Sequence, residues 1–495
     1  MIMEQDELEE GLLVKEEDEA KPVHDESNRS SSSITDSSNT SSSSASPVVI
    51  FSTFTAVCGS FCYGCAMGYS SAAQSGIREE LGLSVAAYSL FGSIMTLGGT
   101  IGALFSGKTA SLFGRRHTMW FSELFCTLGW LIIALAKDAR WLDIGRFLLG
   151  IGVGFVTYVV PVYIAEITPK NIRGACTFAN QLMQNCGLSL MYITGNFVSW
   201  RPLALIGAIP CAVQLIGLFF VPESARWLAK LGRQKEFEIA LQRLRGKDVD
   251  ISEEVATIRE GMETVDDSNS GIRHLFQKKY AHALTVGIGL MLLQQFSGCS
   301  GVALYASSIF EQAGFPINIG TTTLALIMVP KAVLGLFLVD RWGRRPLLMA
   351  SASGMCLCCI LLGISFSLKA ANHFPELTPI LAFMGVLGYI MTFAVGFGGL
   401  PWIIMCEIFP INVKVSAGSL VTLANWSTGW IIAYFFNFML EWSPAGTFFI
   451  FAGACGVTIA FVYTLVPETK GLTLEEIQRA SIITLSPIII PKVNK

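Results

Sequence analysis

The chain has 495 residues, of which 52% are hydrophobic and only 14% are charged. A soluble domain carries roughly a quarter charged residues, so this composition excludes an ordinary water-facing surface and favours a protein embedded in a bilayer. The net charge of −3 is small and argues against a nucleic-acid partner.

The N-terminal region, residues 1–47, is acidic from Glu4 to Glu19 and rich in serine from Ser27 to Ser46. Because such a composition cannot bury a hydrophobic core, the sequence predicts a disordered tail here. The first apolar segment begins only near Pro47, which is too deep in the chain for a cleavable signal peptide.

Twelve apolar segments follow, and each approaches the roughly 20 residues that a helix needs to cross the hydrocarbon core. The first six lie near 48–71, 87–107, 118–136, 141–163, 175–199 and 203–221. The second six lie near 281–304, 318–340, 346–367, 378–403, 414–440 and 444–466. We therefore predict an all-α membrane protein of twelve transmembrane helices in two six-helix bundles, 48–221 and 281–466.

A polar connector, residues 222–280, joins the two bundles, and its 236–245 part predicts a surface helix. Residues 467–495 form the predicted C-terminal tail, whose apolar run 482–490 is too short for a span. Most Lys and Arg residues outside the N-terminal tail lie in the connector and in the loops after even-numbered spans. The positive-inside rule then predicts that these loops and both termini are cytosolic.

Three motifs of the first half recur in the same order in the second half. The three pairs are Gly114–Arg115–Arg116 with Gly343–Arg344–Arg345, Glu166–Ile167–Thr168–Pro169 with Glu407–Ile408–Phe409–Pro410, and Pro222–Glu223–Ser224 with Pro467–Glu468–Thr469. Their nearly constant separation indicates a duplication. In duplicated carriers of this kind the substrate binds at the midplane between the halves.

These motifs resemble those of the sugar-porter family of the major facilitator superfamily over residues 48–475. Further matching motifs are Gly145–Arg146, Pro161–Val162–Tyr163, Gln294–Gln295–Phe296–Ser297–Gly298 and Asp340–Arg341–Trp342–Gly343. Within the family, the stretches 66–77 and 305–310 are most similar to the plant early-responsive-to-dehydration group of monosaccharide transporters. The resemblance implies a major facilitator fold and a hexose substrate carried by alternating access.

Charged residues at the predicted cytosolic ends of the spans form matching sets in the two halves. The resemblance implies that these sets join across the bundles in the outward-facing state and separate in the inward-facing state, because half-hydrated ion pairs each contribute modestly. The predicted gating residues are Arg115, Arg116, Arg146, Glu166, Arg173, Glu223, Arg226, Asp340, Arg344, Arg345, Glu407 and Glu468. Ser111 stands where the family usually has Asp, which predicts a weaker outward-facing lock.

A sugar site needs amides and hydroxyls for the sugar's hydroxyl groups and an aromatic platform for its apolar face. Polar residues within spans are costly and are therefore candidates for function, with an interhelical hydrogen bond as the competing explanation. By resemblance, the predicted substrate-binding residues are Gln181, Gln294, Gln295, Ser300, Trp402 and Asn425. The glycines and proline at 398–401 predict a broken helix before Trp402, and Pro330 suggests another hinge.

Ser300 stands where relatives usually have Asn, and Met328 where many have Asn, so we expect few hydrogen bonds to the sugar and a millimolar affinity. Proton-coupled relatives place an Asp of the first span opposite Arg146, whereas this chain has Ala66. The simplest interpretation is facilitated diffusion, although Asp143 or Glu123 could carry a proton instead. Lys331 lies deep in its span, where it either lines a cavity or extends to the interface.

The main prediction is a monosaccharide uniporter. A proton-coupled hexose or polyol symporter stays open, as does a sugar sensor with negligible flux. No nucleophile–base set indicates an enzyme. The thirteen scattered cysteines are interpreted as small buried residues, with no metal, cofactor or disulfide framework. The partners expected are a monosaccharide and the lipid bilayer, with protons left open, and a monomer is expected.

The N-terminal tail contains Leu8–Glu9–Glu10–Gly11–Leu12–Leu13, which resembles the dileucine sorting signals of vacuolar carriers without matching their commonest spacing. This favours the vacuolar membrane slightly over the plasma membrane.

Overall fold

The structure is a computed structural model that describes residues 46–169, 172–246, 249–263, 275, 277, 280–409 and 411–468. These residues belong to the unit Ala45–Lys495. Residues 1–45 of the predicted N-terminal tail, with its dileucine-like motif, lie outside the described residues, as does nearly all of the C-terminal tail.

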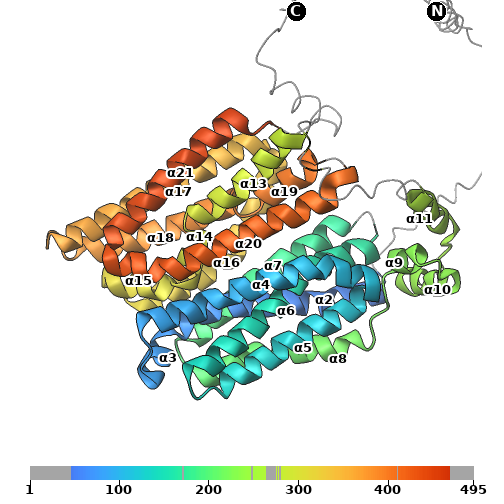
Figure 1. Cartoon of the computed structure of the whole chain (residues 1–495), viewed down its shortest axis with the longest axis horizontal. Helices are drawn as coiled ribbons and strands as arrows, with labels where there is room; N and C mark the ends of the chain where they lie inside the picture. The colour runs from blue at the N-terminus through green and yellow to red at the C-terminus, as the bar shows by residue number, and fades with distance from the viewer. Residues whose placement is uncertain are drawn as a thin grey trace, which may run out of the picture. The chain divides into compact units, whose positions relative to one another are not determined.

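All secondary structure in the described ranges is helical (Figure 1). The first half contains α2 (Pro47–Ala72), α3 (Gln74–Leu81), α4 (Val85–Phe113), α5 (Arg115–Ala134), α6 (Ala139–Ile167), α7 (Arg173–Thr194) and α8 (Trp200–Leu218). The connector contributes α9 (Ala225–Lys230), α10 (Gln234–Arg245) and α11 (Ser252–Glu263). The second half contains α13 (Ala281–Phe296), α14 (Cys299–Leu304), α15 (Ala306–Ala313), α16 (Ile317–Arg341), α17 (Arg344–Ala370), α18 (Leu377–Val395), α19 (Leu400–Ile408), α20 (Ile411–Trp442) and α21 (Pro444–Leu465).

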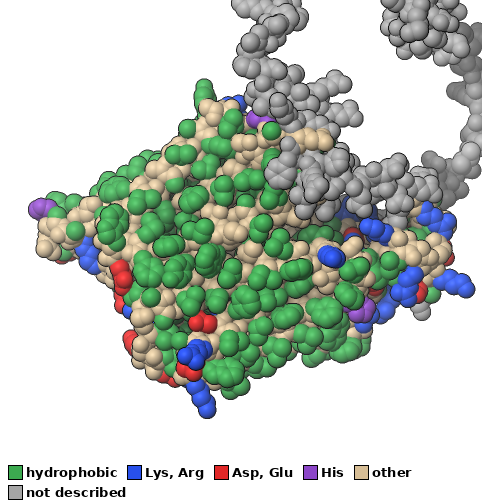
Figure 2. Space-filling model, in the orientation of Figure 1, with side chains coloured by type: hydrophobic (Ala, Val, Ile, Leu, Met, Phe, Trp, Pro, Cys, Tyr) green, Lys and Arg blue, Asp and Glu red, His purple; other side chains and the backbone are tan. Residues whose placement is uncertain are grey.

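Each of the twelve predicted spans coincides with one of these helices or with consecutive shorter ones, so the all-α prediction is confirmed. Eight segments are long and apolar enough to cross a membrane by length and composition, and α13 is a shorter apolar helix. Large hydrophobic side chains such as Phe105, Leu128, Ile216 and Phe337 are exposed along the helices. Figure 2 shows hydrophobic side chains covering the helices, with many of the charged ones gathered at the two ends. Such a surface is stable against lipid tails.

Two spans are interrupted, and the sequence predicted only one of the interruptions. As predicted, the tenth span breaks between Val395 and Leu400. The seventh, predicted as one helix over 281–304, instead ends its first part at Phe296 because Gly298 adopts a φ of 94°. Residues with side chains avoid this region of φ, so glycine sets the position of the break. By contrast, α16 runs through Pro330 without interruption.

Within the first half, glycines allow α4 and α6 to approach each other closely. A Cβ atom added at Gly98 or Gly102 would overlap carbonyl oxygens of α6, and one at Gly150 or Gly154 would overlap carbonyl oxygens of α4. Small residues at such crossings are how membrane helices gain packing contacts without a hydrophobic driving force. Between the halves, α4 packs against α20 and α7 packs against α16 (Figure 1).

The connector helices pack on one another through Trp227, Leu228 and Phe237. They are also tied to the first half, because Arg245 Nη1 donates a hydrogen bond of 2.8 Å to the carbonyl oxygen of Ile167. We call the ends of the spans nearest these helices the connector side and the opposite ends the far side. Because successive spans alternate in direction, α2, α7 and α20 end on the far side, and α4 and α16 begin there.

Candidate functional site

Four of the six predicted sugar-binding residues form one hydrogen-bonded network in the second half. Asn425 Nδ2 donates to Gln294 Oε1 at 2.8 Å, and Gln295 Nε2 donates to Asn425 Oδ1 at 3.3 Å. Ser300 Oγ donates to Gln295 Oε1 at 2.5 Å. The break in the tenth span takes part as well, since Gln294 Nε2 donates to the carbonyl oxygen of Phe397 at 2.5 Å. The network therefore joins α13, α14, α20 and the break between α18 and α19.

This network could exchange its internal hydrogen bonds for bonds to a ligand's hydroxyl groups. Amides carry both donors and acceptors, which suits hydroxyl groups that also do both. Gln294, Gln295 and Asn425 are each at most 8% exposed, so their internal bonds are protected from water. The Cα of Gly429 adjoins the network, because a Cβ there would lie 3.3 Å from Gln295 Oε1.

The other two predicted binding residues stand apart from the network. Gln181 lies on α7 of the first half with its side chain exposed, and Trp402 lies in the first turn of α19, half-buried against the core. Among the described residues, no hydrogen bond connects either side chain to Gln294, Gln295 or Asn425. Trp426, one residue after Asn425, packs instead across the halves against Tyr63, with ring centroids 6.4 Å apart.

Hydrogen bonds between the two halves gather on the far side. Ser307 N and Ser308 Oγ bind Ser71 Oγ and Gln74 Oε1 at 2.9 and 2.7 Å respectively. Asn437 Nδ2 donates to Ser89 Oγ at 3.0 Å. From α7, Ser189 Oγ donates to the carbonyl oxygen of Ala325 at 2.9 Å, Tyr192 OH donates to that of Ala303 at 2.8 Å, and Asn196 Nδ2 donates to Thr322 Oγ1 at 3.2 Å. We call this set the far-side contacts.

On the connector side, the ion pairs between described residues each stay within one half. Arg115 Nη2 lies 2.8 Å from Glu166 Oε1 in the first half, and Arg344 Nη2 lies 3.0 Å from Glu407 Oε1 in the second. The two pairs occupy equivalent positions of the duplicated motifs. Glu166 also accepts a hydrogen bond of 2.5 Å from Ser224 Oγ.

Two further carboxylates bind helix starts in the same duplicated manner. Glu223 Oε1 accepts from the backbone N–H groups of Arg115 and Arg116 at 2.9 and 3.1 Å. Glu468 accepts from those of Arg344 and Arg345 at 2.9 and 3.1 Å. A carboxylate stabilises the positive end of a helix dipole and fills its unpaired N–H groups. Burial nevertheless raises the pKa of Glu223 above its ordinary value.

The remaining predicted gating residues occupy different surroundings. Arg116 Nε donates to the carbonyl oxygen of Leu218 at 2.8 Å, and Arg345 donates to that of Tyr463. Arg173 makes a long bond of 3.5 Å to the carbonyl oxygen of Thr168. Arg226 is exposed in α9, and the side chain of Asp340 lies outside what the structure describes.

Arg146 differs from the other predicted gating residues, because it is completely buried inside the first half. It donates a hydrogen bond to Ser70 Oγ, and its guanidinium carbon lies 5.1 Å from the ring centre of Phe91 and 5.7 Å from that of Tyr69. Aromatic faces stabilise a cation where water is excluded. No carboxylate of a described residue forms an ion pair with Arg146.

Lys331 lies near the middle of α16. It follows Leu324 by seven residues and Met328 by three, so it lies on the helix face of these two buried side chains. Leu326 and Phe337, by contrast, are 65% and 66% exposed. Lys331 itself is half-buried, which places it at the edge of the inward face of α16.

The family model described as "Sugar (and other) transporter" matches residues 35–480. The chain belongs to the sugar transporter family. The transporter is 62% identical over 432 residues to the sugar transporter ESL1 of Arabidopsis thaliana, covering 87% of this chain and 92% of that protein. It is 60% identical to the sugar transporter ERD6 of the same plant, covering 87% of each.

Solved structures show the same fold. The inward-open conformation of the xylose transporter XylE from E. coli matches with a TM-score of 0.74 at 23% identity, covering 87% of this chain and 99% of that one. The structure of the proton:xylose symporter XylE bound to 6-bromo-6-deoxy-D-glucose matches with a TM-score of 0.70 at 25% identity, covering 88% and 100%. The transporter is therefore a multi-pass membrane protein of the major facilitator superfamily, as predicted.

The far-side contacts were not predicted as functional. Ser71 and Gln74 lie in one of the two stretches that suggested the plant group, and Ser307 and Ser308 lie in the other. The structure shows that these two stretches bind each other across the halves. Their shared small polar residues were the available signal, but a single sequence does not show which span ends meet.

Proposed function

We propose that this transporter carries a hexose by facilitated diffusion in an alternating-access cycle. The observation that carries the proposal is the network of Gln294, Gln295, Ser300 and Asn425 beside a broken helix. In the proposed cycle a sugar replaces these internal hydrogen bonds, and Gln181 and Trp402 complete the site as the halves close around it.

The absence of proton coupling is proposed from the surroundings of Arg146. In this chain its guanidinium contacts the neutral side chains of Tyr69, Phe91 and Ser70 and forms no ion pair with a carboxylate of the described residues. Ala66, one turn before Ser70, cannot carry a proton. The symporter named among the similar structures supports the alternative of proton coupling, which would here need another carboxyl group.

We further propose that the connector side is cytosolic, that both termini lie there, and that the structure is the inward-facing state. The clustering of Lys and Arg on that side supports this orientation. The halves are bound together by the far-side contacts, whereas Arg115–Glu166 and Arg344–Glu407 each remain within one half. In the outward-facing state the far-side contacts would separate, and the charged sets of the two halves would meet on the connector side.

A low affinity is proposed because the site offers few free hydrogen-bonding groups. Ser300 supplies one hydroxyl where relatives usually have an amide, and Met328 supplies none. A millimolar dissociation constant corresponds to about −4 kcal/mol of binding free energy. The vacuolar membrane and a monomeric state are proposed from the sequence motif and the family alone.

The proposal is tested by measuring uptake of labelled glucose, fructose, xylose and a polyol into proteoliposomes containing the full chain. We expect hexose uptake that equilibrates and saturates at millimolar concentrations. Preferential uptake of the polyol would contradict the hexose assignment, and a micromolar half-saturation would contradict the low affinity. No uptake of any of the four compounds would favour the sugar sensor.

A further inference from the structure

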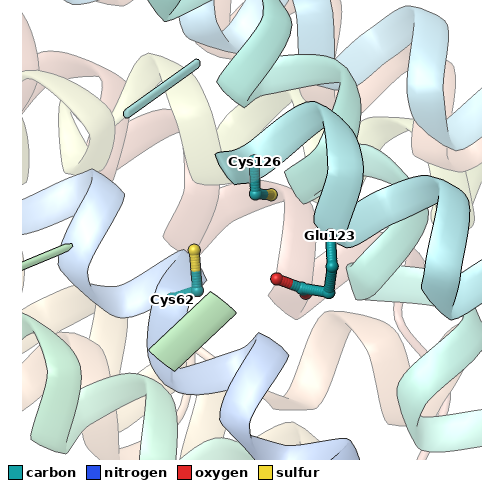
Figure 3. A group of neighbouring side chains, drawn as sticks. All are labelled: Cys62, Glu123 and Cys126. Atoms are coloured by element: carbon teal, nitrogen blue, oxygen red, sulfur yellow. The ribbon is translucent and has the colours of Figure 1, made fainter. Parts of the chain in front are cut away.

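A group of buried polar side chains inside the first half plays no part in the proposed transport site. Cys62 of α2, Glu123 and Cys126 of α5, and Cys211 of α8 are all 0% exposed. Figure 3 shows Cys62, Glu123 and Cys126 turned toward one another. Their sulfur atoms and a carboxylate oxygen all lie within 4.8 Å of one another. We call these four residues the cysteine–glutamate cluster.

The fourth member adds a second sulfur contact. Cys62 Sγ lies 3.1 Å from Cys211 Sγ, so the first, third and sixth spans meet at this point. Trp130 Nε1 donates to Cys62 Sγ at 3.4 Å, which would orient that sulfur and partly balance a negative charge on it. On α5, Glu123 and Cys126 are three residues apart and therefore project from the same helix face.

The carboxylate of Glu123 lacks the partners that a buried carboxylate needs. Neither of its oxygens has a hydrogen bond to a described residue, and the amide of the buried Gln214 beside it also lacks one. Both side chains lie against Gly59, where a Cβ would be 3.0 Å from Glu123 Oε1. An isolated ionised carboxylate in an apolar interior costs many kcal/mol, so this group requires a counter-charge or a proton.

We propose that the cysteine–glutamate cluster binds a thiophilic divalent metal ion, with Zn²⁺ as the best fit. Thiolates together with a carboxylate are characteristic zinc ligands, at bond lengths of about 2.0–2.3 Å. A tetrahedral ion with such bonds separates its donor atoms by about 3.3–3.8 Å. The donor atoms of Cys62, Glu123 and Cys126 already lie within 4.8 Å of one another, and Cys211 Sγ lies beside Cys62 Sγ, so side-chain rotations could bring them around an ion.

The charge balance favours this occupant in a bilayer. Binding of Zn²⁺ releases the thiol proton of Cys62 and any proton on Glu123 to solvent, and Zn²⁺ with the Cys62 thiolate and the Glu123 carboxylate is neutral. Cys126 and Cys211 complete the four ligands as neutral thiols. The competing arrangement is a neutral Glu123 that turns to hydrogen-bond Gln214, with three unligated thiols packed around it. Because the site joins three spans of one half, a bound ion would hold that half rigid while the two halves move relative to each other.

The test measures zinc in the full chain, purified in detergent, equilibrated with Zn²⁺ and then desalted. We expect one zinc per chain, with affinity lowered by about 10- to 100-fold or more in Cys62→Ser and in Glu123→Gln. Cys65→Ser is the matched control, because Cys65 is equally buried on the same helix but lies outside the cluster. In parallel, Co²⁺ should give a thiolate charge-transfer absorption band in the wild type and in Cys65→Ser but not in Cys62→Ser.

If a variant fails to fold, measurements on the wild type alone still test whether the cluster binds zinc. Zn²⁺ should raise the unfolding temperature of the wild type, and a chelator that enters membranes should lower it again. If the wild type binds no zinc and its unfolding temperature ignores Zn²⁺, the neutral arrangement is correct. Equal zinc content in the wild type, Cys62→Ser and Cys65→Ser would likewise overturn the site.

Discussion

The far-side contacts predict that single hydroxyl groups set the balance between the two conformations of the carrier. Ser308→Ala removes the bond of 2.7 Å that Ser308 donates to Gln74 across the halves. The substitution leaves α15 able to form, since alanine favours helices. It acts on only one of the two conformations, because in our proposal this contact exists solely in the inward-facing state.

The expected shift in the conformational equilibrium follows from the net free energy that one hydrogen bond contributes. A bond between uncharged groups contributes about 0.5–1.5 kcal/mol, so its loss shifts the conformational equilibrium toward the outward-facing state by roughly 2- to 13-fold. The larger value applies where Gln74 Oε1, in a side chain 7% exposed, is left unpaired. The matched control is Ser365→Ala, because Ser365 donates an equally short bond of 2.7 Å to Thr378 within the second half.

The assay follows the accessibility of the connector side. Thr177 is exposed on the connector-side part of α7, so Thr177→Cys, with Cys176 and Cys186 replaced by Ser, can be labelled by an impermeant maleimide. Ser308→Ala should slow this labelling by at most the factor given above, with the full factor reached where the outward-facing state predominates, and Ser365→Ala should leave it unchanged. Equal labelling in Ser308→Ala and the parent would refute the conclusion that far-side hydrogen bonds hold the inward-facing state.

Four other changes have defined outcomes. Asn425→Ala removes the bonds to both glutamines of α13, so sugar affinity should fall by roughly 5- to 150-fold from about 1–3 kcal/mol, as measured by half-saturation of uptake. Ala66→Asp places a carboxyl group one turn from the residue that binds Arg146, so uptake should gain a dependence on external pH that the wild type lacks. Hydrogen bonds from Arg201 hold the pKa of Glu80 below its ordinary value of 4.5. The contact therefore stabilises the fold at pH 7, and this stabilisation is lost as the pH falls below 4.5 and through the lowered pKa of Glu80. Glu80→Gln should accordingly lose less stability than the wild type on acidification, as measured by thermal unfolding. Lys331→Met should change the transport rate if Lys331 lines the sugar path.

Each of these expectations can be contradicted, and two of them have a matched control variant. Thr428→Ala, one turn after Asn425, removes only a bond to its own helix and should leave half-saturation unchanged. Unaltered affinity in Asn425→Ala would contradict its place in the site. For Ala66→Asp, a pH response equal to that of Ala66→Asn would show that the carboxyl group is irrelevant. Parallel acid sensitivity of wild type and Glu80→Gln would remove the role of that carboxylate, and silent Lys331→Met would indicate a side chain that extends to the interface.

Local chemistry made most residues of the hydrogen-bonded network stand out in the sequence. Gln294 and Gln295 are adjacent amides in an apolar span, where burying an amide without a hydrogen-bond partner is costly, so they stand out as candidates for function. The glycines and proline before Trp402 predict a broken helix. The break at Gly298 was missed, although the glycine was visible, because hydrophobicity alone does not distinguish a continuous helix from two short ones in line. The duplicated capping by Glu223 and Glu468 follows from motifs that the sequence already paired.

Contacts between distant segments could not be predicted in the same way. Ser71 and Ser307 are 236 residues apart, and nothing local in either stretch indicates its partner. The cysteines gave a similar difficulty. Cys62, Cys126 and Cys211 have the spacing of scattered apolar residues, so the sequence predicted no metal site, and only the packing of three spans brings them to Glu123.

The most direct test of the central proposal is uptake of labelled glucose into proteoliposomes with and without an imposed proton gradient. A passive carrier should bring internal glucose only to the external concentration, at the same final level in both conditions. A carrier coupled to one proton could accumulate glucose up to about tenfold for each pH unit of gradient, since one unit corresponds to 1.36 kcal/mol. Accumulation above equilibrium would contradict facilitated diffusion and show that a residue other than Ala66 carries the proton.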